Sequence, residues 1–147
     1  MTMSETQGPE SATTQGAQGQ TPFVAIGGAE MIARLVDAFY PRVQRDPMLA
    51  PIFPEDIAPV RDKQYMFLTQ FLGGPPLYSQ RFGHPMLRAR HLPHAITPAR
   101  AEAWLRCMRE AMDECGLSGP VREGVYERLK MTAYHMVNRP DDESPSS

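Results

Sequence analysis

Three polar side chains lie on the apolar faces of segments with helical periodicity, where a hydrogen-bonding group needs a partner. They are Tyr40, Gln64 and Trp104, each on a different segment. A buried donor without a partner costs about 1 to 3 kcal/mol, so three donors that converge on one cavity would suit a small polar ligand. The alternative is that Tyr40 and Trp104 are core residues with one satisfied hydrogen bond each. Gln64 would then turn outward, as most glutamines do.

The histidines are the candidate metal ligands. The chain has four of them: His84, His91, His94 and His135. His91 is distinguished by Arg88 and Arg90 beside it, because arginines at a pocket rim can pair with carboxylates. The alternative for this segment is a solvated basic turn. No acidic residue accompanies a histidine at the His-Glu-x-x-His spacing of zinc hydrolases, so a hydrolytic metal site is not supported.

Four segments carry the apolar stripe of an amphipathic helix and would position these residues. They run from Ala29 to Arg45, from Ile57 to Leu72, from Thr97 to Gly116 and from Ser118 to Val137. Proline after the first segment and glycine after the second mark their ends. Thr97 with Pro98 has the pattern of a helix start, and residues 85–91 allow one short helix. Without an alternating strand or a repeat, the sequence predicts an all-α domain of two helix pairs.

Length and composition limit the classes of function. A chain of 147 residues can build one sizeable core. Its formal net charge of -2 leaves no surplus of Lys and Arg for nucleic acid. No run approaches the roughly 20 apolar residues of a membrane span, and none resembles a secretory signal, so we expect a cytoplasmic protein. Cys107 and Cys115 lie eight residues apart in one predicted helix, too far for a disulfide.

The two ends of the chain are rich in small polar residues and have little to bury. Residues 1–22 and residues 140–147 are therefore predicted to be disordered tails. The domain itself is predicted to span residues 23–139.

Six short motifs follow one another along residues 23–139. They are Gly27-Gly28, Phe39-Tyr40, Phe53-Pro54-Glu55-Asp56, Gly73-Gly74-Pro75, Gly83-His84-Pro85-x-Leu87-Arg88-x-Arg90-His91 and Ala103-Trp104-Leu105. Together they closely resemble the group II truncated haemoglobins. The resemblance implies a two-on-two helical sandwich, in which helix pairs called B with E and G with H enclose haem b. No Cys-x-x-Cys-His motif is present, so the haem would be held without covalent links.

The resemblance also assigns roles to residues of this chain. His91 matches the proximal ligand of the iron, while Tyr40, Gln64 and Trp104 match the distal residues that hydrogen-bond dioxygen. Five further positions match haem contacts: Phe53, Val60, Lys63, Tyr78 and Arg90. Because the iron binds a neutral imidazole, the other ring nitrogen of His91 is expected to donate to a backbone carbonyl. No residue is assigned a catalytic role.

Two positions depart from the family pattern. His94 stands where a phenylalanine usually follows the His-x-Pro run, which would make the proximal side more polar. Val60 is apolar where several relatives carry a small or hydroxyl-bearing residue. This shifts ligand hydrogen bonding onto the three distal donors.

The function implied by the resemblance is reversible binding of dioxygen and other diatomic gases, for storage, delivery or sensing. The alternative is a haem redox enzyme, either a nitric oxide dioxygenase or a peroxidase-like protein, that needs an external reductant. A third hypothesis is a haem-free helical interaction domain. Expected partners are the gases themselves, a reductase and a second copy of the chain in a homo-oligomer, without nucleic acid or membrane.

Overall fold

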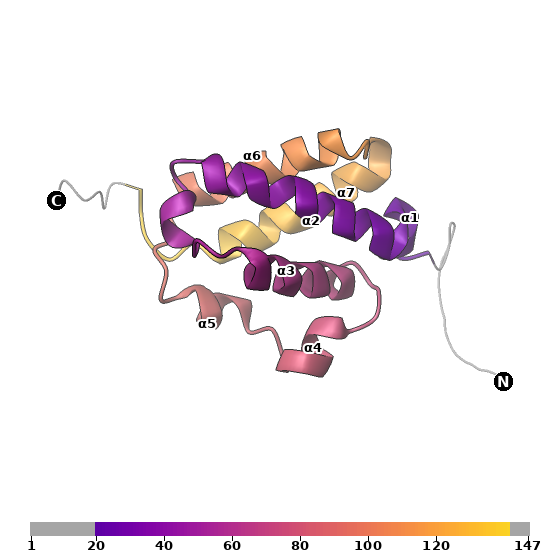
Figure 1. Ribbon diagram of the computed structural model, residues 1–147, viewed down its shortest axis with the longest axis horizontal. Coiled ribbons are helices and arrows are strands. Elements are labelled where there is room, and N and C mark those ends of the chain that lie inside the picture. The colour runs from indigo at the N-terminus through magenta and orange to yellow at the C-terminus, as the bar shows by residue number, and fades with distance from the viewer. Residues whose placement is uncertain (1–19, 142–147) are drawn as a thin grey trace.

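The computed structural model describes residues 20–141, and all the regular structure in that range is helical (Figure 1). Four long helices form the domain: α2 (Gly28–Arg45), α3 (Ala58–Phe71), α6 (Pro98–Glu114) and α7 (Gly119–His135). They confirm the four predicted segments, with ends close to those expected. The last prediction extends too far, because α7 stops at His135 and Val137 follows the helix.

The described residues also form four short helices, one before α2 and three between long helices. They are α1 (Pro22–Ile26), the 3-10 helix η2 (Ala50–Ile52), α4 (Leu77–Phe82) and α5 (Leu87–His91). Only α5 was expected. Helix α1 begins inside the predicted N-terminal tail, capped by the Thr21 side chain, and its Phe23 N–H donates to Leu72 O at 2.8 Å. The rest of the predicted tails, residues 1–19 and 142–147, lies outside the described residues.

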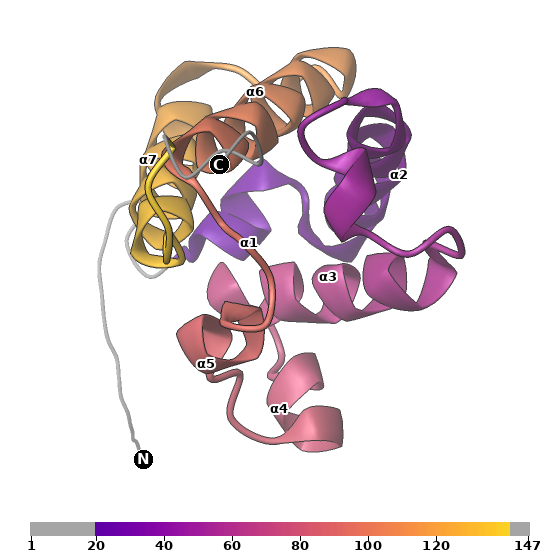
Figure 2. The same ribbon diagram turned by 90° about the vertical axis from the view of Figure 1, so that its left-hand side faces the viewer.

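The long helices form two stacked pairs. Helix α2 packs against α3 and against α6, and α6 packs against α7. Figures 1 and 2 show α4 and α5 on the opposite side of α3 from α2. This arrangement confirms the predicted all-α fold of two helix pairs. The segment that contains α5 closes the space between α3 and the pair α6 and α7.

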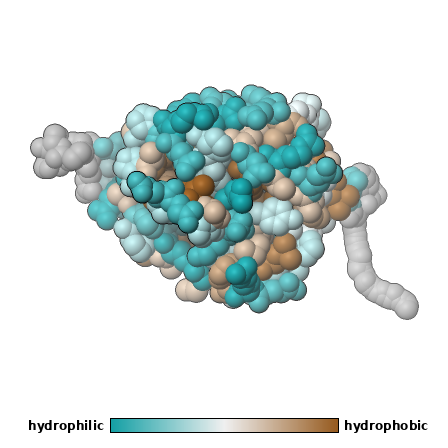
Figure 3. All heavy atoms as spheres, in the orientation of Figure 1, coloured by the Kyte–Doolittle hydropathy of each residue, from teal (hydrophilic) through white to brown (hydrophobic). Residues whose placement is uncertain are grey.

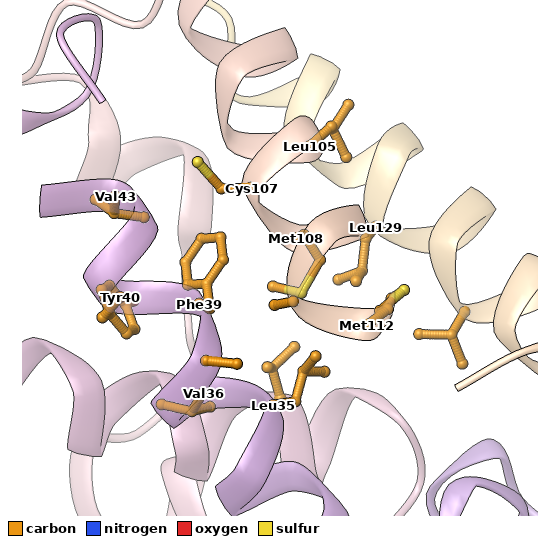
Figure 4. Close-up of a cluster of buried hydrophobic side chains, with 14 of the residues drawn as sticks. Leu35, Val36, Phe39, Tyr40, Val43, Leu105, Cys107, Met108, Met112 and Leu129 are labelled. Atoms are coloured by element: carbon orange, nitrogen blue, oxygen red, sulfur yellow. The ribbon is translucent and has the colours of Figure 1, made fainter. Parts of the chain in front are cut away.

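The core lies where α2, α6 and α7 meet (Figure 4). One buried cluster contains Leu35 and Phe39 of α2, Met108 and Met112 of α6, and Leu129 of α7. These positions recur at the three- and four-residue spacing that places side chains on one face of a helix. The amphipathic pattern of the sequence is therefore the direct cause of this packing.

Both cysteines, Cys107 and Cys115, are free thiols, as the sequence predicted. On the face shown in Figure 3, hydrophilic residues predominate and the hydrophobic areas are small and separate. Among residues 20–141, no helix combines the length and apolar character needed to cross a bilayer.

One buried hydroxyl makes a stability prediction possible. Thr69 of α3 is fully buried, and its Oγ1 has no hydrogen-bond partner within the described residues. Thr69→Val replaces this hydroxyl by a methyl group of similar size. We expect the substitution to raise the free energy of unfolding by about 1 kcal/mol, because an unsatisfied buried polar group is removed. Denaturant unfolding monitored by circular dichroism measures this change.

Thr132→Val is the matched control for this prediction. The Thr132 hydroxyl donates to the Arg128 carbonyl at 3.0 Å, so its removal loses a hydrogen bond and should bring no gain. An equal loss of stability in both variants would contradict the account given for Thr69.

Candidate functional site

A cavity of about 330 Å³ opens between α3 and α5 on one side and α6 and α7 on the other. The cavity is lined by all nine residues to which the sequence assigned a site role. These are Tyr40, Phe53, Val60, Lys63, Gln64, Tyr78, Arg90, His91 and Trp104. They come from five helices and the segment before α3, so the fold brings together side chains that lie far apart in the chain.

Tyr40, Gln64 and Trp104 supply hydrogen-bond donors to this cavity. In the described part of the chain, their hydroxyl, amide and indole groups make no hydrogen bond to another residue, so all three are available to a ligand. Burial raises the pKa of Tyr40, because the phenolate would lose its hydration. The phenol therefore stays protonated and keeps its donor.

Phe39 fixes the orientation of two of these donors. Its fully buried ring packs edge-on against Tyr40 at 4.8 Å and against Trp104 at 5.1 Å between ring centroids. On the other side, Tyr40 meets Phe53 at 6.2 Å, also edge-on. Because aromatic pairs prefer this geometry, the distal donors are held before any ligand enters.

His91, the last residue of α5, is half-buried at the cavity wall. Its Nδ1 lies 2.7 Å from the Leu87 carbonyl oxygen. Since a carbonyl can only accept, Nδ1 must carry the proton, and Nε2 keeps the lone pair that binds a metal. The hydrogen bond to a backbone carbonyl that the sequence analysis expected is therefore present.

The start of α5 explains why this histidine is held at this place. Met86 adopts a left-handed backbone conformation, with φ of 47°, which is unusual for a residue other than glycine. The Met86 N–H donates to His84 Nδ1 at 3.1 Å, and this contact stabilises the turn. His84 thus stabilises the turn that precedes α5.

Two residues that the sequence did not single out hold the segment after His91. The Asn138 side chain donates from Nδ2 to His91 O at 3.2 Å and to His94 O at 3.0 Å, and its Oδ1 accepts from Ile96 N at 3.1 Å. Arg100 donates from Nη1 to the Ala95 carbonyl at 2.7 Å. The Asn138 contacts had no signal in the sequence, because they depend on how segments more than 40 residues apart approach.

The rim of the cavity near α4 is basic. Lys63 lies over the ring of Phe82, with 5.2 Å from Nζ to the centroid, and Arg90 lies over the ring of Tyr78 at 5.8 Å. The Gln70 amide donates to Ser79 Oγ at 2.8 Å and accepts from Ser79 N at 2.9 Å, which ties α4 to α3. Acidic groups of a bound molecule would find cationic partners at this rim.

The residues present fit a non-covalent haem. The cavity volume lies within the usual range of about 300 to 1,000 Å³ for small-molecule and cofactor sites, and its walls are mainly apolar. One imidazole offers Nε2 to a metal, and neither cysteine lines the cavity. His94 lines the cavity as well, so the departure from the family pattern falls inside the site.

Comparisons with known proteins agree with this site. The family model described as bacterial-like globin matches residues 21–138. The chain is 54% identical to the group 2 truncated hemoglobin YjbI of Bacillus subtilis over 132 residues, which are 90% of this chain and 99% of that protein. The crystal structure of the group II truncated hemoglobin from Bacillus anthracis superposes with a TM-score of 0.82 and 60% identity, over 83% of this chain and 99% of that one.

A further solved structure is that of a truncated oxygen-avid haemoglobin from Bacillus subtilis. It has a TM-score of 0.79 and 57% identity, and the match covers 81% of this chain and all of that one. The family model spans the region that contains every residue of the cavity described above. The chain therefore belongs to the bacterial-like globin family and, within it, to the group II truncated haemoglobins.

Proposed function

We propose that this globin reversibly binds dioxygen and related diatomic gases at a non-covalent haem b whose proximal ligand is His91. One observation carries the proposal. The Nε2 atom of His91 is free to bind iron, and the same cavity contains three donors that make no hydrogen bond within residues 20–141. The oxygen-avid haemoglobin of Bacillus subtilis, to which the chain is 57% identical, supports this choice of ligand.

Each part of the cavity has a role in this proposal. The haem supplies an iron with an open coordination position for the gas. Lys63, Tyr78 and Arg90 would bind the acidic side groups of the haem, while Phe53 and Val60 would pack against its faces. The Leu87 carbonyl accepts a hydrogen bond from Nδ1–H of His91, which makes Nε2 a stronger base.

Tyr40, Gln64 and Trp104 would stabilise partial negative charge on the bound gas. Donors fixed in a dry cavity are more effective than water, because they need no reorganisation and their charge is poorly screened. The donors on this side are a phenol, an amide and an indole, without the histidine–arginine pair of a dedicated peroxidase. We therefore propose ligand binding, rather than sustained turnover, as the main activity.

Titration of the purified apoprotein with hemin tests the proposal. We expect a tight one-to-one complex with a Soret band, and a stable oxygenated spectrum after reduction in air. Failure to form any oxygenated complex would contradict oxygen binding. Nitrate produced in a single turnover with nitric oxide, but not sustained with a reductant, would separate binding from catalysis.

The proposal includes a cytoplasmic location, a separate reductase and self-association. Both cysteines are free thiols, as is usual in a reducing compartment. A reductase is needed because ferric iron does not bind dioxygen. Fractionation of the cell of origin and sedimentation of the pure protein would test location and self-association.

A further inference from the structure

One stretch of this slightly acidic chain contains basic residues and no acidic ones. Residues 63–101 contain five of the fifteen Lys and Arg residues and none of the seventeen Asp and Glu residues. The five are Lys63, Arg81, Arg88, Arg90 and Arg100. The stretch includes α4 and α5, which lie together on the far side of α3 from α2 (Figure 2). This end of the molecule therefore carries positive charge without an acidic residue in the same stretch of chain.

Two of these arginines lie outside the proposed haem site, and one of them, Arg88, donates from Nη2 to the Val137 carbonyl at 3.3 Å. Lys63 and Arg90 line the cavity and would face the haem's acidic groups. Arg81 and Arg88 are exposed, do not line the cavity, and take part in none of the ion pairs found within residues 20–141.

Two large apolar side chains are exposed at the two ends of α5. Met86 is 55% exposed and Leu92 is 50% exposed, and they flank the five-residue helix α5. We call Arg81, Met86, Arg88 and Leu92 the α4–α5 surface. Methionine and arginine are enriched in protein–protein interfaces, whose centres are more apolar than the rest of the surface. Because α5 carries His91, this surface covers the proximal side of the proposed haem.

We propose that the α4–α5 surface docks an acidic electron-carrier protein, a flavoprotein or iron–sulfur protein. The inference rests on the proposed function. The carrier loses one electron and the ferric iron gains it, without any bond formed or broken. Interfaces between redox partners are small, below about 1,200 Å². A surface defined by four residues is compatible with an interface of this size. A membrane is a poorer fit, because α5 has five residues, far fewer than a membrane-bound amphipathic helix, and the chain carries net negative charge.

The test compares two double charge reversals in the haem-loaded protein. Arg81→Glu with Arg88→Glu changes the α4–α5 surface, and Arg34→Glu with Lys130→Glu makes the same charge change at exposed positions of α2 and α7. The probe is a reduced acidic flavodoxin, with stopped-flow haem reduction and binding of oxidised flavodoxin by NMR as readouts. We expect the first variant to be reduced about tenfold more slowly at low salt, and to lose most of the salt dependence of the wild type.

Equal rates in the two double variants would overturn the docking proposal. So would a wild-type rate that does not fall with salt. A different result would point to a membrane rather than a protein partner. In that case, Arg81→Glu with Arg88→Glu alone would lose binding to phosphatidylglycerol vesicles, while its reduction by flavodoxin would be unchanged. Hemin titration of the wild type and of each variant separates failure of the docking proposal from failure of the proposed function. A wild type that forms no Soret complex contradicts the proposed function itself.

A second, independent observation concerns Asn138, the only asparagine of the chain. Its amide makes hydrogen bonds to the His91 and His94 carbonyls and to Ile96 N, and its backbone N–H donates to Ile96 O at 2.9 Å. These contacts join the end of α7 to the segment that follows the iron ligand. All the donors and the acceptor of this side chain are directed at residues 91–96.

We infer that Asn138 is a positioning residue for the proximal histidine. By holding the His91 carbonyl, it fixes the backbone from which the imidazole extends, while the Leu87 carbonyl fixes the ring. Groups that orient a metal ligand typically change metal affinity about 10- to 100-fold when they are removed. This inference also rests on the proposed function, because it requires His91 to bind iron.

Asn138→Asp tests the inference with little change of shape. The carboxylate can still accept from Ile96 N, but it loses both donors and faces two carbonyl oxygens. We expect hemin to dissociate about tenfold faster and the iron–histidine stretching band of the ferrous protein to shift or broaden. Gln70→Glu is the matched control, because the Gln70 amide makes a similar pair of bonds between α3 and α4.

The control separates positioning from general stability. If Asn138→Asp lowers the melting temperature as Gln70→Glu does, but leaves hemin loss and the iron–histidine band unchanged, Asn138 is merely structural and the inference is wrong. In the same experiment, the wild type must bind hemin and His91→Ala must not. Absence of this difference would contradict the proposed function rather than the role of Asn138.

Discussion

Apoprotein in which His91 is replaced by alanine will bind hemin more than about 100-fold more weakly than the wild type. Removing a residue that only hydrogen-bonds to a metal ligand typically weakens metal binding about 10- to 100-fold. Removing the ligand itself breaks the bond to the iron, so its effect on hemin affinity should be larger. His91 is the only residue whose ring is oriented with Nδ1 on a carbonyl, at 2.7 Å from Leu87 O, within the cavity. Spectrophotometric titration of the Soret band measures the change.

His94→Ala is the control, since His94 lines the same cavity three residues later. It should retain tight hemin binding. Exogenous imidazole should restore the spectrum of His91→Gly, because a free imidazole can occupy the space left by the side chain. Loss of hemin binding in His94→Ala with retention in His91→Ala would contradict the assignment of the proximal ligand.

Removing the distal donors will have the second largest effect. Tyr40→Phe is expected to speed dioxygen dissociation about tenfold, because the loss of one hydrogen bond costs about 1.4 kcal/mol within the usual range for such bonds. Adding Gln64→Leu and Trp104→Phe should bring the total to about 100-fold or more, with the increments not additive because the donors share one ligand. Stopped-flow replacement of dioxygen by carbon monoxide measures the rate.

Carbon monoxide dissociation is the internal control. This gas takes on little negative charge, so its release should change far less than that of dioxygen in the same variants. Equal changes for both gases would mean that the three side chains act by filling space rather than by donating hydrogen bonds.

The pH dependence of oxygen release follows from Tyr40. Burial raises the pKa of its phenol above the ordinary value of 10.0, so the donor persists throughout the neutral and moderately alkaline range. Dioxygen dissociation should therefore be constant from pH 6 to about pH 10. Because the folded state favours the protonated phenol, the contribution of Tyr40 to stability is present below the unfolded pKa and declines as the pH rises above it. A faster dissociation that titrates near pH 9 would contradict this account.

The comparison of sequence and structure shows where local pattern is sufficient. The four long helices have enough turns for an apolar stripe to repeat, so their positions were predictable from the spacing of residues such as Leu35 and Phe39. The short helices α1 and α4 have five and six residues, too few for a periodicity to appear. They depend on tertiary contacts, such as Phe23 N to Leu72 O and the Gln70–Ser79 pair.

The site divides in the same way. The sequence by itself determined which polar residues lie on inward helix faces, because the period of the helix decides which side of it faces the core. The resemblance to a family then gave His91 its role. Only the tertiary structure decided that Tyr40, Gln64 and Trp104 share one cavity with His91, and that Asn138, 47 residues further along the chain, holds the His91 carbonyl. Periodicity describes a single helix, whereas these contacts depend on how separate helices pack.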